Sequence, residues 1–176
     1  MPGLDFPALL QTVAQSALRP WLQQALGPAL ACDVDQCWLR PGRPAHHWHQ
    51  DGALRFDFGS DATGDGAALL EMLTCWLPLT PCGVHAPGIE WVDADLRALL
   101  PPAELTDDAV LSRFGAAARV RPVMQPGDAL LFDGALLHRT HLTPAMAQPR
   151  CSIELRFFAA DRLPARLAAD RFVTVA

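Results

Sequence analysis

Proline and glycine divide this chain into short apolar runs, and this division limits the folds that it can adopt. The 176 residues include 16 Pro and 12 Gly, many of them in turn-forming pairs such as Pro126-Gly127. Residues 150–158 alternate apolar and polar side chains most clearly, which predicts a strand with one buried face. Many short strands joined by Gly/Pro turns predict one jelly-roll or barrel with helices added to it.

Four segments are predicted to be helical. Residues 5–26 place apolar side chains at helical spacing, and Gly27-Pro28 predicts the end of that helix. Pro20 would kink or divide it. Residues 106–114 follow the same pattern, with Thr106 as the N-cap. Two further helices are expected at residues 93–100 and 162–170.

The predicted strands are short. The apolar run at residues 67–79 suits either a helix or a buried strand by its length, and Pro78 and Pro81 favour a strand that enters a turn. Other strands are expected at residues 32–39, 54–58, 120–123, 129–132, 135–141 and 150–158, with a Gly-rich turn at 59–66 and a loop leading into a short strand within 81–92.

Composition excludes several classes of protein. Hydrophobic residues make up 51% of the chain, so it is not a disordered protein. A net charge of −5 argues against a nucleic-acid partner. No apolar run is long enough to span a membrane, and Met1 to Leu10 lacks the basic start of a signal peptide. We therefore expect one cytoplasmic domain over residues 1–176, with its jelly-roll core at about 32–158. We expect neither a nucleic-acid nor a membrane partner, and the oligomeric state stays open.

Five cysteines are spaced irregularly, at positions 32, 37, 75, 82 and 151. Their odd number and spacing favour reduced thiols. Cys32, Cys37 and nearby histidines could hold zinc, although no CxxC pair supports such a site. A Cys-His nucleophile is an alternative, but Cys75 and Cys151 sit in apolar runs, where a thiol is usually inert.

The stretch from His46 to Gly52 carries three of the six histidines and one carboxylate. His49 and Asp51 are two residues apart, so in an extended backbone they project from the same face and can converge on one point. One nitrogen and one oxygen donor suit a divalent metal, which needs a third ligand from elsewhere. The alternative is a solvated turn with Asp51-Gly52 at its corner.

Two features later in the chain add to the possible metal site at His49 and Asp51. His138 ends an apolar run after Pro-Gly-Asp and is a candidate third ligand, or simply a polar residue at a strand end. Two His and one carboxylate on one face of an octahedron form the non-haem Fe(II) arrangement. Arg150 is followed by Ser152 on the same strand face, and together they can bind a carboxylate. Otherwise Arg150 is a surface residue at a strand start.

With these features the sequence resembles the phytanoyl-CoA dioxygenase-like Fe(II)/2-oxoglutarate oxygenases. The residues that carry the resemblance occur in family order between about 46 and 158. They are Trp48-His49-Gln50-Asp51-Gly52, Cys75-Trp76-Leu77-Pro78-Leu79, Pro126-Gly127-Asp128-Ala129-Leu130-Leu131-Phe132, His138-Arg139-Thr140 and Arg150-Cys151-Ser152.

The resemblance implies a mainly β fold, the double-stranded β-helix or cupin-like jelly-roll, with an N-terminal helix and a few peripheral helices. It implies Fe(II), 2-oxoglutarate and O₂, with His49, Asp51 and His138 as iron ligands. Arg150 and Ser152 would hold the distal carboxylate of 2-oxoglutarate, with Thr140 near it. Trp76 matches a position where the family places an aromatic against the co-substrate, or else it is plain core. Arg156 lies on the same strand face as Arg150 and is the alternative residue, or rival, for binding this carboxylate.

The expected activity is hydroxylation of an aliphatic C–H, which the carboxylate of Asp51 favours because related halogenases have Ala or Gly there; desaturation and ring chemistry stay open. The chain is much shorter than phytanoyl-CoA hydroxylase, so we expect a small polar metabolite or a peptide-like substrate and not a CoA thioester. Alternatives are a non-catalytic metal- or ligand-binding jelly-roll and a cupin-type enzyme that needs no keto acid. Residues that could line the substrate end, or form a solvated rim, are His46, His47, Arg55, Arg139 and His141.

Overall fold

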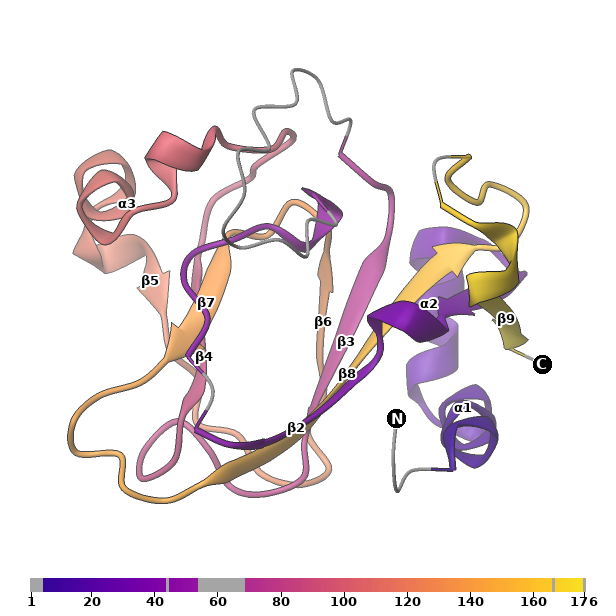
Figure 1. Ribbon diagram of the computed structural model, residues 1–176, viewed down its shortest axis with the longest axis horizontal. Helices are drawn as coiled ribbons and strands as arrows, with labels where there is room; N and C mark the ends of the chain where they lie inside the picture. The colour runs from indigo at the N-terminus through magenta and orange to yellow at the C-terminus, as the bar shows by residue number, and fades with distance from the viewer. Residues whose placement is uncertain (1–4, 44, 54–68, 166, 176) are drawn as a thin grey trace.

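The computed structural model describes residues 5–43, 45–53, 69–165 and 167–175. Two antiparallel sheets form the body of the molecule, as the sequence predicts (Figure 1). The larger has the order β6-β3-β8-β1-β9, with β2 also paired to β8, and the smaller has the order β5-β4-β7. The strands are β1 Leu30–Asp33, β2 Trp38–Gly42, β3 Leu73–Pro78, β4 Gly88–Val92, β5 Arg119–Val120, β6 Leu130–Asp133, β7 His138–His141, β8 Arg150–Ala159 and β9 Phe172–Val175.

Strand β8 is the centre of the larger sheet, because it pairs with β1, β2 and β3. Its odd-numbered residues from Ile153 to Phe157 are buried in an apolar core. Helices α1 (Phe6–Gln15) and α2 (Leu18–Leu26) cover that face and supply apolar side chains to the same core. The even-numbered residues of β8 therefore point to the other face, toward the smaller sheet.

The predicted helix at 5–26 is two helices, and the division falls at Ser16-Ala17, before Pro20. The hydroxyl of Ser16 accepts from the backbone N–H of Leu18 at 3.2 Å, which gives α2 a new start. Pro20 is the third residue of α2, where a missing N–H removes no intrahelical bond. Gly27 ends α2 with φ of 98°, as predicted.

Strand predictions hold in type more than in extent. The ambiguous run at 67–79 contains strand β3, and the long strand at 150–158 is β8. The strand expected at 32–39 is instead β1 and β2, separated by a 3₁₀ turn at Val34–Gln36. The side chain of Asp33 accepts from the N–H of Asp35 and so turns the chain there. The strand and turn expected at 54–58 and 59–66 lie outside the described residues.

Helix α3 (Asp107–Phe114) is confirmed, with Thr106 as its N-cap. The helix predicted at 93–100 is wrong. Instead, the side-chain amide of Gln50 binds the backbone of that segment. It donates to the carbonyl of Ala98 and accepts from the N–H of Leu100. The helix predicted at 162–170 is also wrong. A 3₁₀ turn at Ala169–Arg171 leads into β9, which pairs with β1.

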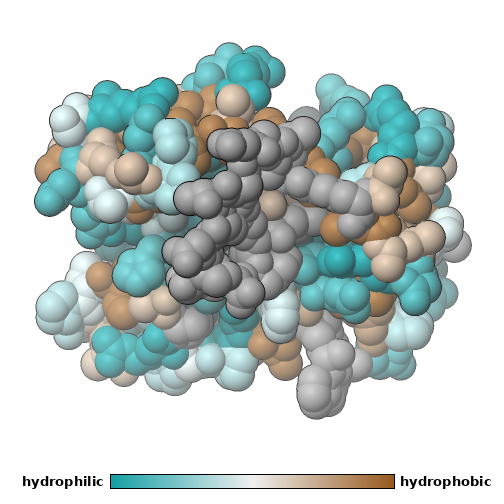
Figure 2. Space-filling view, turned by 45° about the horizontal axis from the view of Figure 1, so that its top comes forward, coloured by the Kyte–Doolittle hydropathy of each residue, from teal (hydrophilic) through white to brown (hydrophobic). Residues whose placement is uncertain are grey.

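The surface shows polar and apolar residues interspersed over the face drawn in Figure 2. Exposed large apolar side chains such as Trp21 and Val123 come from different parts of the chain. None of the described helices is both long and apolar enough to cross a membrane.

Candidate metal centre and co-substrate site

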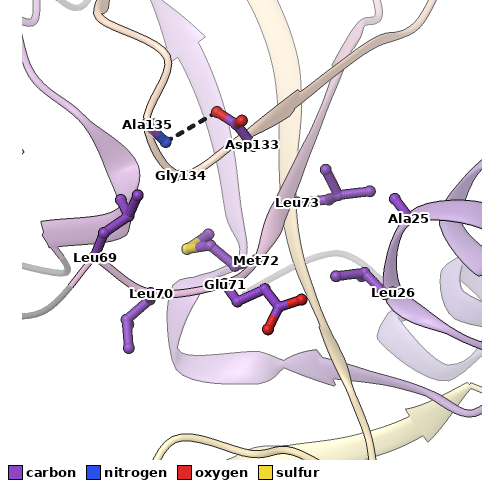
Figure 3. A pocket seen from close by; sticks show the side chains of 10 residues that line it. All are labelled: Ala25, Leu26, Leu69, Leu70, Glu71, Met72, Leu73, Asp133, Gly134 and Ala135. Carbon is purple, nitrogen blue, oxygen red and sulfur yellow. Dashed lines mark hydrogen bonds between the residues drawn. The ribbon is translucent and has the colours of Figure 1, made fainter. Parts of the chain in front are cut away.

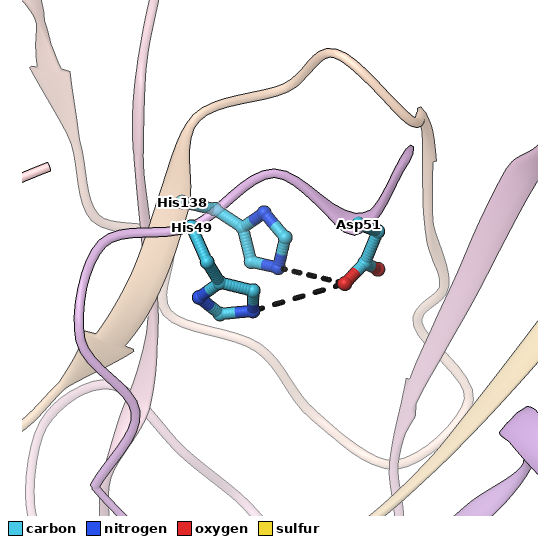
Figure 4. Close-up of side chains that lie close together, drawn as sticks. All are labelled: His49, Asp51 and His138. Carbon is cyan, nitrogen blue, oxygen red and sulfur yellow. Dashed lines mark ion pairs between the residues drawn. The ribbon is translucent and has the colours of Figure 1, made fainter. Parts of the chain in front are cut away.

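His49, Asp51 and His138 lie together between the two sheets (Figure 4). His49 and His138 are fixed by a two-bond bridge between their backbones, with N···O distances of 2.9 and 3.0 Å. Asp51 starts a 3₁₀ turn two residues later. Its Oδ1 lies 3.7 Å from Nε2 of His49 and 3.9 Å from Nε2 of His138. One ligand atom from each residue lies within 4.8 Å of the others, a suitable spacing for a shared cation.

Both imidazoles are oriented by backbone carbonyls. Nδ1 of His49 faces the carbonyl of His47 at 2.6 Å, and Nδ1 of His138 faces that of Leu136 at 3.0 Å. Since a carbonyl only accepts, Nδ1 carries the proton and Nε2 presents its lone pair toward Asp51. Burial lowers the pKa of His49 to about 4 and also lowers the pKa of His138. Both rings are therefore neutral near pH 7, as metal binding requires.

Asp51 is ionised despite its burial. Burial alone would raise its pKa, but Arg156, the two imidazoles and Thr74 together hold the pKa well below the usual value. Arg156 donates from Nη2 to Oδ1 at 2.7 Å, and the hydroxyl of Thr74 donates to Oδ2 at 2.6 Å. The centre thus offers two neutral nitrogen donors and one carboxylate oxygen, the donor set of a 2-His-1-carboxylate metal site.

Two glycines allow the turn at Asp51 to reach the chain that leads to His138. Gly52 donates its N–H to the carbonyl of Gly134 at 2.8 Å. A Cβ at Gly52 would lie 2.9 Å from that carbonyl oxygen, and a Cβ at Gly134 would lie 2.8 Å from Cα of Gly52. Any larger residue at either position would push the ligand turn away.

Arg150 lies on the same inner face of β8 and is 3% exposed. Its Nη1 donates to the carbonyl of Gly88 at 3.0 Å, and its guanidinium carbon lies 5.3 Å from the centre of the Trp76 ring. Within the described parts of the chain, Nε of Arg150 and the hydroxyl of Ser152 are buried without a hydrogen-bond partner. Buried groups of this kind are normally satisfied, so they fit an anionic ligand that accepts from both.

The two other predicted co-substrate residues have partners within the protein. Thr140 accepts from the backbone N–H of His46 at 3.1 Å. Trp76 packs with Ile89 and Phe132 in a small apolar core and also supports Arg150. Trp76 is thus a core residue that also lies beside Arg150, and its predicted place against the co-substrate stays a prediction.

Arg156, the rival of Arg150, has two donor atoms bound within the protein, although its Nε, like that of Arg150, is buried without a hydrogen-bond partner among the described residues. Besides Asp51, it donates from Nη1 to the carbonyl of Gln36 at 2.8 Å. Its position beside a candidate ligand was missed from the sequence. Strand alternation places Arg156 on the inner face, but no sequence pattern identifies Asp51 as its partner.

The expected substrate-end residues are not all at the centre. Alternation along β7 turns His138 and Thr140 inward, so Arg139 and His141 face outward. Arg139 donates to Glu90 at 2.6 Å and also contacts Asp107, which corrects its expected place at the substrate end. The ring of His46 lies 6.2 Å from that of His49, whereas His47 is exposed. Arg55 lies outside the described residues.

A cavity of about 240 Å³ is lined by none of the three triad residues (Figure 3). Its wall is largely apolar, and the carboxylate of Asp133 in that wall is already bound by the N–H groups of Ala135 and Leu136. The lining residues are Ala25, Leu26, Leu69, Leu70, Glu71, Met72, Leu73, Asp133, Gly134 and Ala135. We assign it no part in the chemistry of the triad.

Solved structures of Fe/2-oxoglutarate-dependent enzymes share this fold. EctD from S. alaskensis with bound Fe matches with a TM-score of 0.67 and 20% identity, over 90% of this chain and 56% of that chain. EctD with 2-oxoglutarate and 5-hydroxyectoine matches with 0.63 and 20%, over 91% and 55%. The epimerase SnoN with Fe³⁺, alpha ketoglutarate and nogalamycin RO matches with 0.59 and 15%, over 97% and 74%.

The fold is therefore the predicted double-stranded β-helix, a jelly-roll that these solved structures share. This chain spans little more than half the length of the EctD structures. Among these neighbours, EctD was crystallised with Fe and with 2-oxoglutarate, and SnoN with Fe³⁺ and alpha ketoglutarate. In comparisons at the level of sequence, no family model and no curated protein matches.

Proposed function

We propose that this protein is a non-haem Fe(II)- and 2-oxoglutarate-dependent dioxygenase of the phytanoyl-CoA dioxygenase-like type. The observation that carries the proposal is the triad: two neutral Nε2 atoms and one ionised Oδ1 face one another within 4.8 Å. A buried Arg150 with an unused donor lies on the same side of the sheet. A metal site beside a carboxylate receptor is the combination that a 2-oxoglutarate enzyme requires.

Each residue has a role in this proposal. His49, Asp51 and His138 would hold the metal, and Fe(II) bound by this donor set would remain able to take further ligands. Arg150 and Ser152 bind the distal carboxylate of 2-oxoglutarate, Thr140 lies near it, and Trp76 forms the wall behind Arg150. Bound Fe(II) supplies the activation of O₂ that is coupled to oxidative decarboxylation of the keto acid. The protein fixes the ligand geometry and keeps both imidazoles neutral.

The proposed reaction is hydroxylation of an aliphatic C–H in a small polar metabolite or a peptide-like molecule. Asp51 occupies the third ligand position, which favours hydroxylation over halogenation. The structural neighbours include an epimerase and a carbocyclase, so other outcomes of C–H activation are alternatives. The jelly-roll uses most of the described chain, and the net charge of −5 disfavours a nucleotide-bearing CoA thioester. We place this activity in the cytoplasm, in a single domain over residues 1–176.

The other candidate is a non-catalytic jelly-roll that binds a metal or small ligand. The test is succinate formation from 2-oxoglutarate by protein loaded with Fe(II) under nitrogen and then exposed to O₂. We expect succinate above that formed by free Fe(II) and by the His49→Ala variant. If the wild-type protein binds Mn(II) and 2-oxoglutarate yet forms no more succinate than these controls, the non-catalytic alternative is correct.

A further inference from the structure

Arg40 on β2 repeats the arrangement of Arg150. Its guanidinium carbon lies 5.3 Å from the centre of the Trp38 ring, as that of Arg150 lies 5.3 Å from the Trp76 ring. Within the described residues, Nε of each arginine is buried without a hydrogen-bond partner. Arg40 is paired across the strands with Ser152, which places both on the inner face of the larger sheet. The sheet therefore holds a second arginine built like the first.

Glu154 lies between the two arginine–tryptophan pairs. It is directly opposite Trp38 on one neighbouring strand and Trp76 on the other, so all three share the inner face. Its Oε1 lies 2.9 Å from Nε of Arg40, and its Oε2 lies 4.0 Å from Nη2 of Arg156, the group that donates to Asp51. Arg156 thus lies between Glu154 and Asp51, the proposed metal ligand.

Arg40 and Glu154 carry opposite charges and lie close together, but the two groups are poorly aligned. Nε of Arg40 lies 2.9 Å from the carboxylate and makes no hydrogen bond with it. Their side chains keep 22% and 13% of their surface accessible. By comparison, Arg156 and Asp51 keep 6% and 3% and form a hydrogen bond of 2.7 Å. The Arg40–Glu154 pair is the more open of the two and can exchange partners with a ligand.

We propose that Arg40 and Glu154 are the substrate-recognition pair of the oxygenase, and that the substrate is a zwitterion of the α-amino-acid type. The substrate carboxylate binds Arg40 and its ammonium group binds Glu154. This inference rests on the proposed function, since it assigns the substrate of the same site. The adjacent opposite charges of the pair match a carboxylate and an ammonium group on one carbon atom. In a dicarboxylate the second carboxylate would be repelled by Glu154, and in a diamine one ammonium group would be repelled by Arg40.

The test is calorimetric titration, under nitrogen so that no turnover occurs, of protein loaded with Mn(II) and 2-oxoglutarate. The probes are the common amino acids, each compared with the amine that lacks its carboxylate and the acid that lacks its ammonium group. We expect at least one amino acid to bind, with each single-charge analogue weaker by about tenfold or more, because one charge-assisted contact is lost.

Two variants locate the site. Arg40→Gln and Glu154→Gln should each weaken amino-acid binding by about tenfold, while the affinities for Mn(II) and 2-oxoglutarate stay within about twofold. Glu104→Gln, which removes the same type of ion pair with Arg113 at an exposed position, is the matched control and should bind as the wild type does. Thermal unfolding shows whether each variant is folded, and Arg40→Met and Glu154→Ala, which also remove the charge, replace any variant that is not.

The outcomes separate this inference from the proposed function. If Mn(II) and 2-oxoglutarate bind but no zwitterion does, or if single-charge analogues bind as well as the zwitterion, the assignment of the substrate is wrong and the oxygenase proposal stands. It is also wrong if both folded variants bind the amino acid as the wild type does. If neither Mn(II) nor 2-oxoglutarate binds, the proposed function itself fails.

Discussion

Nη2 of Arg156 lies 2.7 Å from Oδ1 of Asp51, the same oxygen that faces both imidazole Nε2 atoms. The guanidinium therefore holds the carboxylate in the orientation that a metal would need. It also compensates the charge of Asp51 while no cation is bound. Asp51 and Arg156 are side chains 105 residues apart that act as one unit in the centre of the protein.

Removal of Arg156 should destabilise the protein strongly. In Arg156→Met the buried carboxylate of Asp51 loses its charged partner, which costs on the order of 3–5 kcal/mol of unfolding free energy. Urea denaturation of the metal-free protein measures this cost. The double variant Asp51→Asn/Arg156→Met should recover much of the loss. If the double variant is as unstable as the sum of the two single variants, the two side chains are not energetically coupled.

Metal binding should depend on His49 and not on its exposed neighbour His47. His49→Ala removes one of three ligands, so we expect no measurable Fe(II) binding by anaerobic calorimetry. His47→Ala is the control and should bind as the wild type does, because the side chain of His47 is exposed and its backbone carbonyl, which contacts His49, is kept. Unchanged affinity in His49→Ala would indicate a different set of ligands.

Arg150→Ala should raise the 2-oxoglutarate concentration needed for half-maximal succinate formation. The loss of a charged, hydrogen-bonded partner at a buried carboxylate costs on the order of 2–5 kcal/mol. The Kd for 2-oxoglutarate in the Mn(II)-loaded protein measures the same loss without turnover. Arg121→Ala, at a half-exposed arginine of another cluster, is the control. Should Arg156→Ala weaken 2-oxoglutarate binding while Arg150→Ala leaves it unchanged, the co-substrate residue is Arg156.

Glu90 should make the stability of the protein depend on pH in the acid range. It is fully buried, and burial would raise its pKa, but hydrogen bonds from Arg119, Arg139 and Arg121 lower the pKa from 4.5 to about 2. The unfolded chain therefore binds this proton first as the pH falls, so the stabilisation is present above pH 4.5 and is lost between about pH 4.5 and 2.

The size of this effect follows from the shift, at about 1.4 kcal/mol per pKa unit, or roughly 3 kcal/mol in all. Urea denaturation at pH 5 and at pH 3 should show the loss in the wild type. Glu90→Gln, which does not titrate, should show a smaller change over the same range. Equal pH dependence in the two proteins would mean that other groups cause the acid sensitivity.

Local patterns in the sequence determined the type of the main elements and the identity of the candidate ligands. The alternation at residues 150–158 predicted β8, and the N-cap at Thr106 predicted α3. The spacing of His49 and Asp51 and the position of His138 identified three residues that the fold brings together. These predictions succeed because capping and strand alternation act over a few residues, within the backbone itself.

Only the tertiary structure decided which partner each buried polar group has. Gln50 binds the backbone of residues 98–100 and so replaces the helix predicted there, and the C-terminal segment pairs with β1 as a strand. The turn of Arg139 toward Glu90, and of Arg156 toward Asp51, likewise depends on groups far away in the chain. Packing and the need to compensate buried charges determine these partners. Neither can be read from local sequence patterns, because the partners are far apart in the chain.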